Sequence, residues 1–292
     1  MKLSERLIDP KSPERRPRKA AYALPTLFTA GNVFLGFLSI MKSFEGSMLA
    51  AQAGHEGAPN PHFILAAQMI GVALVLDGLD GRIARLLDGT SKFGAELDSL
   101  SDFISFGVAP ALLLYYWCMR PVGGIGWVLT MLLAVCCALR LARFNTMLAN
   151  TDLPAWTSRF FTGVPAPAGA GLVLMPLIAY NEYGTGLADA PALVGIWMVI
   201  VSGLLVSRIP TFSFKRLAIT QRWVLPAMVI VTVFVALLAS ETWNTILACG
   251  LLYLASIPFS HRQFQRLSMQ RPHAPSVDHR VELDHGQDQG PH

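Results

Sequence analysis

Apolar residues occur in long runs along the chain, and polar residues gather in the intervals between them. A helix needs about 20 mostly apolar residues to cross a bilayer. A scan at that length predicts membrane-spanning helices at roughly 22–42, 62–86, 93–117, 124–144, 164–182, 190–208, 222–240 and 242–260. The connections at 118–123 and 183–189 are short, so neighbouring helices should be antiparallel. We therefore expect an all-α, polytopic membrane protein with about eight transmembrane helices.

The overall composition points to the same class. Of the 292 residues, 53% are hydrophobic and only 14% are charged, whereas a soluble domain carries about 25% charged residues. The chain therefore lacks the polar surface that would cover a water-soluble globule of its size. None of the four cysteines forms a C-x-x-C pair, and a free buried cysteine behaves as a small hydrophobe. No disulfide framework or zinc site is expected.

Lysine and arginine divide unequally between the two predicted sides of the membrane. Of the 23 basic residues, 21 fall on the side of the N-terminus, and only Lys42 and Arg120 fall on the other side. The positive-inside rule places the basic side in the cytoplasm. We therefore expect both termini in the cytoplasm, a location in the inner (cytoplasmic) membrane and contact with membrane lipid. Because basic residues that set the membrane orientation account for the net charge of +4, no nucleic-acid partner is expected.

Polar composition at the two ends divides the chain into three regions. Residues 1–20 form a basic cytoplasmic segment without the apolar core of a cleavable signal. Residues 21–260 hold the predicted helices and all of the candidate catalytic chemistry. Residues 261–292 are rich in His, Pro, Gln, Asp and Gly. Because such a composition cannot bury a core, we expect a disordered cytoplasmic tail.

Four aspartates lie inside or beside the second and third predicted helices, where carboxylates are costly and usually functional. Asp77 and Asp80 are three residues apart. Asp98 and Asp102 are four residues apart, so each pair shares one face of its helix. The short link at 88–91 turns the chain back, which allows the two faces to meet. The sequence therefore predicts one acidic site built from two neighbouring helices.

The residue types in this stretch suit a nucleotide-diphosphate ligand. Clustered carboxylates need cations to stay ionised, and their hard oxygens suit Mg²⁺ or Mn²⁺, which leave positions open for phosphate oxygens. Gly81, Ala84 and Gly94 have almost no side chain, so a bulky ligand can approach the backbone. Arg85 supplies a guanidinium fork for a phosphate. We expect the site at the cytoplasmic ends of the two helices.

The stretch from Asp77 to Asp102 resembles the signature of the CDP-alcohol phosphatidyltransferases, D-x-x-D-G-x-x-A-R-x8-G-x-x-x-D-x-x-x-D, at every specified position. Enzymes of this family move a phosphatidyl group from a CDP-linked lipid to an alcohol and release CMP. The resemblance implies two divalent cations, Mn²⁺ or Mg²⁺, held by Asp77, Asp80, Asp98 and Asp102. It also implies that Asp102 is the general base, that Gly81, Ala84, Arg85 and Gly94 bind the CDP-lipid, and that the protein is a homodimer.

Four further stretches resemble the bacterial-type phosphatidylserine synthases within this family, namely 24–32, 138–145, 161–167 and 207–215. Thr26 stands where that group has asparagine, which is a small departure. The resemblance implies CDP-diacylglycerol as donor and L-serine as acceptor. The carboxylate of serine needs a cation, and Arg140, Arg143 and Lys215 lie on the predicted cytoplasmic side. Each of them also fits the simpler interpretation of a positive-inside anchor.

Three other functions stay open on sequence alone. The same chemistry could use glycerol phosphate, inositol phosphate or choline as acceptor. A cation-coupled transporter should carry its acidic site near the bilayer midplane, whereas these aspartates cluster with arginines at a helix end. A structural scaffold gives no reason for four aligned aspartates. The sequence also leaves open whether transfer is a direct displacement or passes through a covalent enzyme intermediate.

Overall fold

The computed structural model describes residues 19–53, 60–86, 92–149, 160–184, 186, 189–207, 210–212 and 224–269. Most of the predicted basic N-terminal segment, most of the predicted C-terminal tail, and Lys215 lie outside the described residues. The statements below concern the described residues.

Helices make up nearly all of the described chain. They are α1 (Lys19–Ala53), α2 (Pro61–Leu86), α3 (Lys92–Asp102), α4 (Ala109–Leu114), α5 (Gly124–Ala149), α6 (Ala166–Val173), α7 (Met175–Tyr183), α8 (Pro191–Val206), α9 (Val224–Ser240) and α10 (Thr242–Met269). Two strands of three residues, β1 (Phe160–Thr162) and β2 (Pro210–Phe212), are also present. The predicted all-α class is confirmed, and each predicted span coincides with a helix or with a run of consecutive helices. The last helix extends into the region that the sequence assigned to the tail.

Four helical runs in the described chain are long and apolar enough to cross a membrane. They are Thr26–Gln52, Pro61–Ile83, Phe93–Val122 and Gly124–Met147. Pro191–Val206 and Thr242–Pro258 are shorter apolar helices. These lengths agree with a multi-pass membrane protein, while the total of eight spans stays a prediction.

The third predicted span is a less regular helix than its sequence indicates. It contains two π-helical segments, Phe103–Val108 and Tyr115–Met119, one on either side of α4. The first follows Asp102 directly and buries three successive residues, Ser105, Phe106 and Gly107. Wider π turns of this kind often occur at functional sites. Hydrophobic periodicity gave no indication of them.

The fifth predicted span is also interrupted. Helices α6 and α7 are separate and meet at Leu174, and Pro176 lies in the first turn of α7. Before α6, strand β1 pairs antiparallel with β2, with Phe161 opposite Thr211. This pairing joins the chain ahead of α6 to the chain that follows α8, so two stretches far apart in sequence lie side by side.

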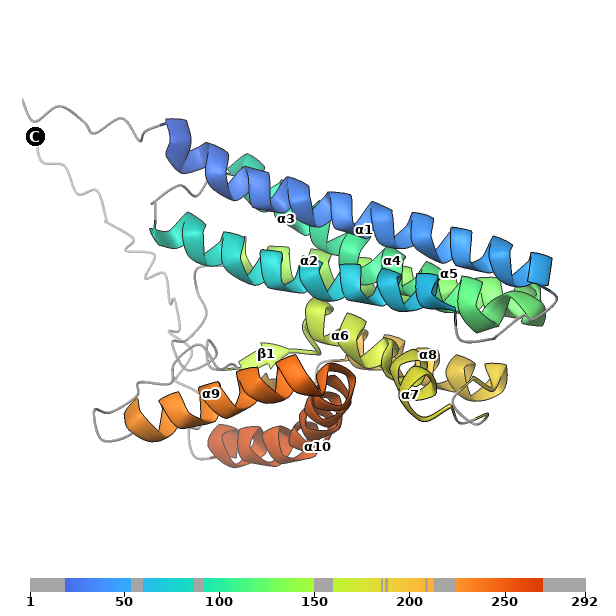
Figure 1. Ribbon diagram of the computed structural model, residues 1–292. Helices are drawn as coiled ribbons and strands as arrows, with labels where there is room; N and C mark the ends of the chain where they lie inside the picture. Colours follow the sequence, from blue (N-terminus) through green and yellow to red (C-terminus); the bar gives the residue numbers. More distant parts are fainter. Residues whose placement is uncertain are drawn as a thin grey trace, which may run out of the picture.

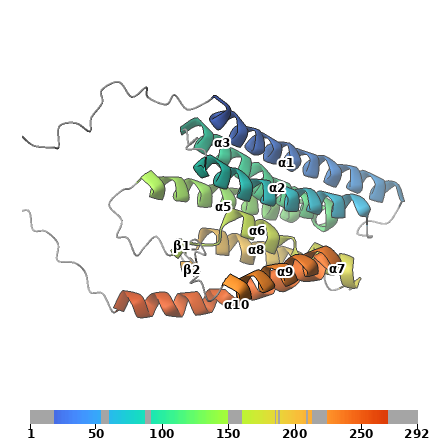
Figure 2. The ribbon, with the colours of Figure 1, turned by 60° about the vertical axis from the view of Figure 1, so that its left-hand side comes forward.

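The helices are arranged with α1 at one edge of the molecule and α9 with α10 at the opposite edge (Figures 1 and 2). Helix α1 packs along α2 and against the run that contains α3 and α4. Helix α5 packs against this run and against α8. Helix α10 contacts α7, α9 and β2. The run from α3 to α4 is therefore enclosed by α1, α2 and α5.

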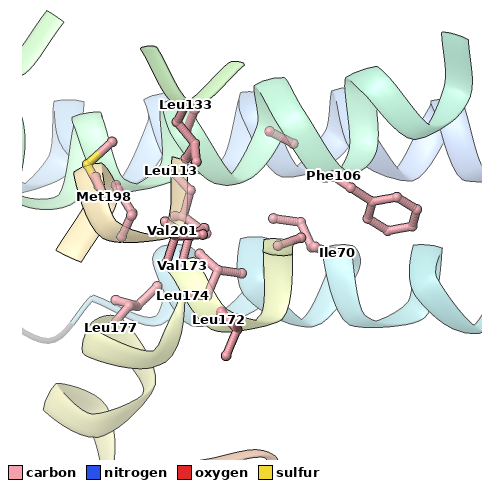
Figure 3. Packing of buried hydrophobic residues seen from close by; sticks show 14 of the residues in the cluster. Ile70, Phe106, Leu113, Leu133, Leu172, Val173, Leu174, Leu177, Met198 and Val201 are labelled. Carbon is pink, nitrogen blue, oxygen red and sulfur yellow. The ribbon is translucent and has the colours of Figure 1, made fainter. Parts of the chain in front are cut away.

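The apolar core lies where α2, α4, α5, α6 and α8 meet (Figure 3). Its members come from distant parts of the chain and include Ile70, Phe106, Leu113, Leu133 and Met198. Lipid tails are as apolar as these side chains, so close van der Waals packing supplies much of the stabilisation in a membrane. The core fixes the helices that carry the acidic residues.

Helix α1 directs its polar side chains inward and its large apolar side chains outward. Thr29, Asn32, Ser39 and Ser43 are buried, while exposed positions include Leu27, Phe34, Phe37 and Met41. The Ser39 hydroxyl donates a hydrogen bond to the carbonyl of Ala66 on α2 at 2.9 Å. Small and hydroxylated residues at helix contacts are typical of membrane helices, and this face of α1 borders the acidic residues.

Candidate active site

Three of the four predicted aspartates come together between α2 and α3. Asp77, Asp98 and Asp102 each place one carboxylate oxygen within 4.8 Å of the others. Asp77 comes from α2 and the other two come from α3, so the two acidic faces meet. Because all three carboxyl groups are partly buried, their negative charges are poorly screened by water. This trio of carboxylates is the centre of the site.

Asp80 lies beside this trio and outside it. Its side chain is only 4% exposed, and its Oδ2 accepts a hydrogen bond of 3.1 Å from the Thr29 hydroxyl of α1. The charge of Asp77 nevertheless acts on Asp80, and the charge of Asp80 acts on Asp98. Outer hydrogen bonds of this kind fix the orientation of a carboxylate that binds metal. Thr29, which lies 51 residues earlier in the sequence, thus holds the carboxylate of Asp80 in place.

Two serines fasten the acidic helix to α1. The Ser101 hydroxyl donates to the carbonyl oxygen of Thr29 at 3.3 Å. The Ser105 hydroxyl donates to the carbonyl oxygen of Asn32 at 2.9 Å. These bonds lie on either side of Asp102 along the chain, and they hold the end of α3 and the start of the π-helical segment against α1.

A further hydrogen bond connects α3 to α5. The amide of Asn145 donates to the hydroxyl of Ser99 at 2.9 Å. Ser99 follows Asp98 directly. Hydrogen bonds to α1 and to α5 therefore both set the position of the carboxylates of α3.

The donor set fits a divalent cation. Three carboxylates supply only oxygen ligands, which Mg²⁺ and Mn²⁺ prefer. Asp102 Oδ1 is buried and has no hydrogen-bond partner among the described residues, and a buried polar atom without a partner is costly. A cation would offset the repulsion among the three carboxylates, and either a cation or the hydroxyl of a substrate would satisfy this oxygen.

The residues expected to face a CDP-lipid lie at the ends of the same two helices. Gly81 is exposed, and a Cβ atom at this position would meet nothing within 4 Å. Gly94 is half-buried on α3. Ala84 and Arg85 belong to α2, but their side chains lie outside the described residues. The open space at Gly81 agrees with close approach of a ligand to the backbone.

The two arginines of α5 that were predicted to bind the acceptor have different surroundings. The Arg140 guanidinium lies 5.4 Å from the centre of the Phe144 ring, and its charge acts on Asp102 and Asp77. Arg143 instead donates from Nη1 to the carbonyl oxygen of Val206, at the end of α8, at 2.7 Å. The structure therefore brings Arg140 toward the acidic site and ties Arg143 to a neighbouring helix.

Sequence reasoning assigned no role to Thr29 or Asn32. Both lie in the stretch 24–32, which contributed only to the resemblance. The available signal was a polar pair spaced three residues apart in an otherwise apolar helix, which indicates one inward face. Their partners could not be found that way, because Asp80, Ser101 and Ser105 are all distant in sequence.

Comparison with known proteins agrees with this geometry. The family model described as CDP-alcohol phosphatidyltransferase matches residues 22–207, and the model CDP-alcohol phosphatidyltransferase 2 matches residues 222–258. The chain therefore belongs to the CDP-alcohol phosphatidyltransferase family. It is thus a membrane transferase, and its acidic cluster could bind the divalent metal on which this family depends.

Relatives within this family share most of the chain. The CDP-diacylglycerol–serine O-phosphatidyltransferase of Mycobacterium leprae is 36% identical over 241 residues, covering 82% of this chain and 75% of the relative. The protein of the same name from Helicobacter pylori strain 26695 is 37% identical over 221 residues, covering 76% of this chain and 83% of the relative. The chain is also 34% identical, over a shorter stretch of 146 residues, to the protein of that name from Methanocaldococcus jannaschii.

Proposed function

We propose that this protein transfers the phosphatidyl group of CDP-diacylglycerol to L-serine, giving phosphatidylserine and CMP. The observation that carries the proposal is the convergence of Asp77, Asp98 and Asp102 within 4.8 Å on two helices that match the family model. The names of the relatives support serine as the acceptor. The charge of Arg140, which acts on Asp102 and Asp77, supports an acceptor that has a carboxylate.

The four aspartates would hold two divalent cations, with Thr29 keeping the carboxylate of Asp80 in position. When bound, such cations neutralise the carboxylates and stabilise the charge on phosphoryl oxygens. Gly81, Ala84, Arg85 and Gly94 would bind the CDP-lipid, where the open space at Gly81 admits the nucleotide to the backbone.

Asp102 is the proposed general base. It takes the proton of the serine hydroxyl, and the serine oxygen forms a bond to the β-phosphorus of CDP-diacylglycerol. The bond from that phosphorus to the oxygen of CMP then breaks, and CMP leaves with the electron pair. The unpartnered, buried Oδ1 of Asp102 supports this role, since a general base must be within hydrogen-bond reach of the proton that it takes.

Arg140 is the proposed partner of the serine carboxylate. Its charge acts on Asp102, so a serine with its hydroxyl at Asp102 could place its carboxylate toward Arg140. Arg143 is occupied by the carbonyl of Val206 and therefore contributes to the site by holding α5 and α8 together. Lys215 stays a candidate from sequence alone.

The site would face the cytoplasm, with the protein in the inner membrane and both termini on the cytoplasmic side. The 21-to-2 division of basic residues supports this orientation. A homodimer is proposed only from the family resemblance.

Release of CMP by the purified protein tests the proposal. With CDP-diacylglycerol and one acceptor at a time, we expect L-serine to drive CMP release and phosphatidylserine to form in equal amount. Glycerol phosphate, inositol phosphate and choline should give little release. If one of these drives turnover and serine does not, the acceptor is wrong although the phosphatidyltransferase class stands.

Metal removal tests the acidic site. We expect activity to vanish in excess EDTA and to return on addition of Mn²⁺ or Mg²⁺. Thermal unfolding in the presence of each metal gives a second readout, because a ligand that binds only the folded state raises the melting temperature. Full turnover in EDTA would remove the metal site from the mechanism.

A further inference from the structure

Asn32 is the most unusual polar residue near the site. Its side chain is completely buried, with 0% exposure. Neither its Oδ1 nor its Nδ2 has a hydrogen-bond partner among the described residues. Buried polar groups are nearly always paired, and each exception needs an explanation. An amide left without partners costs stability, so Asn32 calls for a ligand outside the chain.

The hydrogen bonds around Asn32 locate it beside the acidic helix. One turn before it on α1, Thr29 donates to Asp80. Its own carbonyl accepts from Ser105, which lies three residues after Asp102. Asp102 Oδ1 is also buried and without a partner. The backbone of Asn32 therefore meets the acidic helix at Ser105, about one turn beyond the unpaired Asp102 Oδ1.

The next turn of α1 is closed. A Cβ atom on Gly36 would lie 2.7 Å from the hydroxyl oxygen of Ser105 and 3.2 Å from its Cα, so the helices touch there without room for a ligand. Asn32 thus lies between the Thr29–Asp80 hydrogen bond and a tight helix contact. A fully buried position bounded in this way excludes a bulky CDP-lipid, for which the open surface at Gly81 is available.

We infer that the Asn32 amide binds the α-amino acid end of the acceptor, an inference that rests on the proposed function. An amide offers an acceptor oxygen and two donor hydrogens. The ammonium group of serine can donate to Oδ1, and its carboxylate can accept from Nδ2. Because the amide is neutral, it makes both contacts without adding charge beside the aspartates. Asn32 would thereby select for an acceptor with an amino acid head.

The experiment compares Asn32→Leu with the parent enzyme. Leucine has a similar size and no polar atoms, so the variant should melt at the same temperature as the parent or higher. We expect the serine KM to rise by about tenfold or more, as loss of hydrogen bonds to charged groups predicts, with the CDP-diacylglycerol KM within about twofold of the parent value. Asn32→Asp, which keeps the shape but repels a carboxylate, should raise the serine KM as well.

Ser43→Ala is the matched control. Ser43 is another fully buried polar residue of α1, and its hydroxyl donates to the carbonyl oxygen of Ser39 in the same helix. Its serine KM should equal that of the parent. A serine KM that stays unchanged in both Asn32 variants would overturn the inference and leave the amide a purely structural group.

Two other outcomes would also overturn it. A raised CDP-diacylglycerol KM with an unchanged serine KM would assign the amide to the nucleotide, and a shifted metal requirement with both KM values unchanged would make it a metal ligand. Failure of the proposed function is seen separately, since the parent enzyme itself would then release no CMP with serine.

Discussion

At the scale of single residues, the roles proposed for Asp98 and Asp102 differ although both side chains lie on one face of α3. Both belong to the carboxylate trio, but only Asp102 combines a buried, unpartnered oxygen with the nearby charge of Arg140. The charge of Asp77 acts on both carboxylates, and the charge of Asp80 acts on Asp98. We therefore propose that Asp98 chiefly binds metal and that Asp102 chiefly transfers the proton.

Substituting these two aspartates should separate the roles. We expect Asp102→Asn to lower kcat by about 10²–10⁴-fold, the range typical of a lost general base, with CDP-diacylglycerol binding nearly unchanged. Asp98→Asn should be close to inactive and also bind metal poorly, while still inserting in the membrane. Titrations of metal, lipid and serine measure each effect. Recovery of near-normal kcat by Asp102→Asn at high Mn²⁺ would show that Asp102 is only a metal ligand.

The two arginines of α5 give a second prediction at this scale. Arg140→Gln should raise the serine KM by about tenfold while leaving the CDP-diacylglycerol KM unchanged, because a carboxylate loses its charged partner. Arg143→Gln should mainly lower the melting temperature, since its hydrogen bond to Val206 is lost and bonds from charged donors contribute about 1.5–3 kcal/mol. Equal increases of the serine KM in both variants would contradict this division.

At the scale of elements, the contact between α1 and the π-helical segment Phe103–Val108 positions the site. Hydrogen bonds from Ser101 and Ser105 reach the backbone of α1, and Gly36 allows the helices to approach one turn further along. Because Asp102 lies between the two serines, a change in the distance between α1 and this π-helical segment moves the carboxylate of Asp102.

Gly36→Ala tests this contact. The added Cβ would lie 2.7 Å from Ser105 Oγ, so the helices must separate, and overpacking of this kind costs about 1–3 kcal/mol. We expect a lower melting temperature and slower CMP release. Gly31→Ala on the same helix is the control, because its Cβ would meet Leu76 at an ordinary 3.5 Å. Parent-like melting of both variants would show that the contact is looser than described.

At the scale of the whole molecule, orientation in the membrane decides which compartment supplies serine. Gly57→Cys, in the α1–α2 connection outside the described residues, should react with an impermeant maleimide added to intact cells in a background without native cysteines. Glu96→Cys, at an exposed position of α3, should react only after the cells are opened. The reverse pattern would invert the topology that the basic residues predict.

The sequence predicted the helices better than it predicted the interior of the bundle. Apolar runs predicted where α2, α5 and α8 lie, and spacing predicted that the aspartates of α2 share a face. The bond from Thr29 to Asp80 and the position of Asn32 depend on contacts across 51 and 73 residues, which one sequence without relatives does not reveal. The break at Leu174 was also missed, because α6 and α7 are both apolar.

The π-helical segment after Asp102 has a consequence for how such an enzyme can vary. A π turn holds more residues than an α turn, so it resets the angular phase of the helix that follows. The carboxylates of α3 can therefore lie against Asp77 of α2 while α4, a few residues later, places Leu113 and Leu114 in the apolar core. The side chains of α3 and those of α4 can therefore face different neighbours although the two helices follow one another along one helical run. Substitutions that repack the core half can accumulate without rotating the catalytic half away from its ligands.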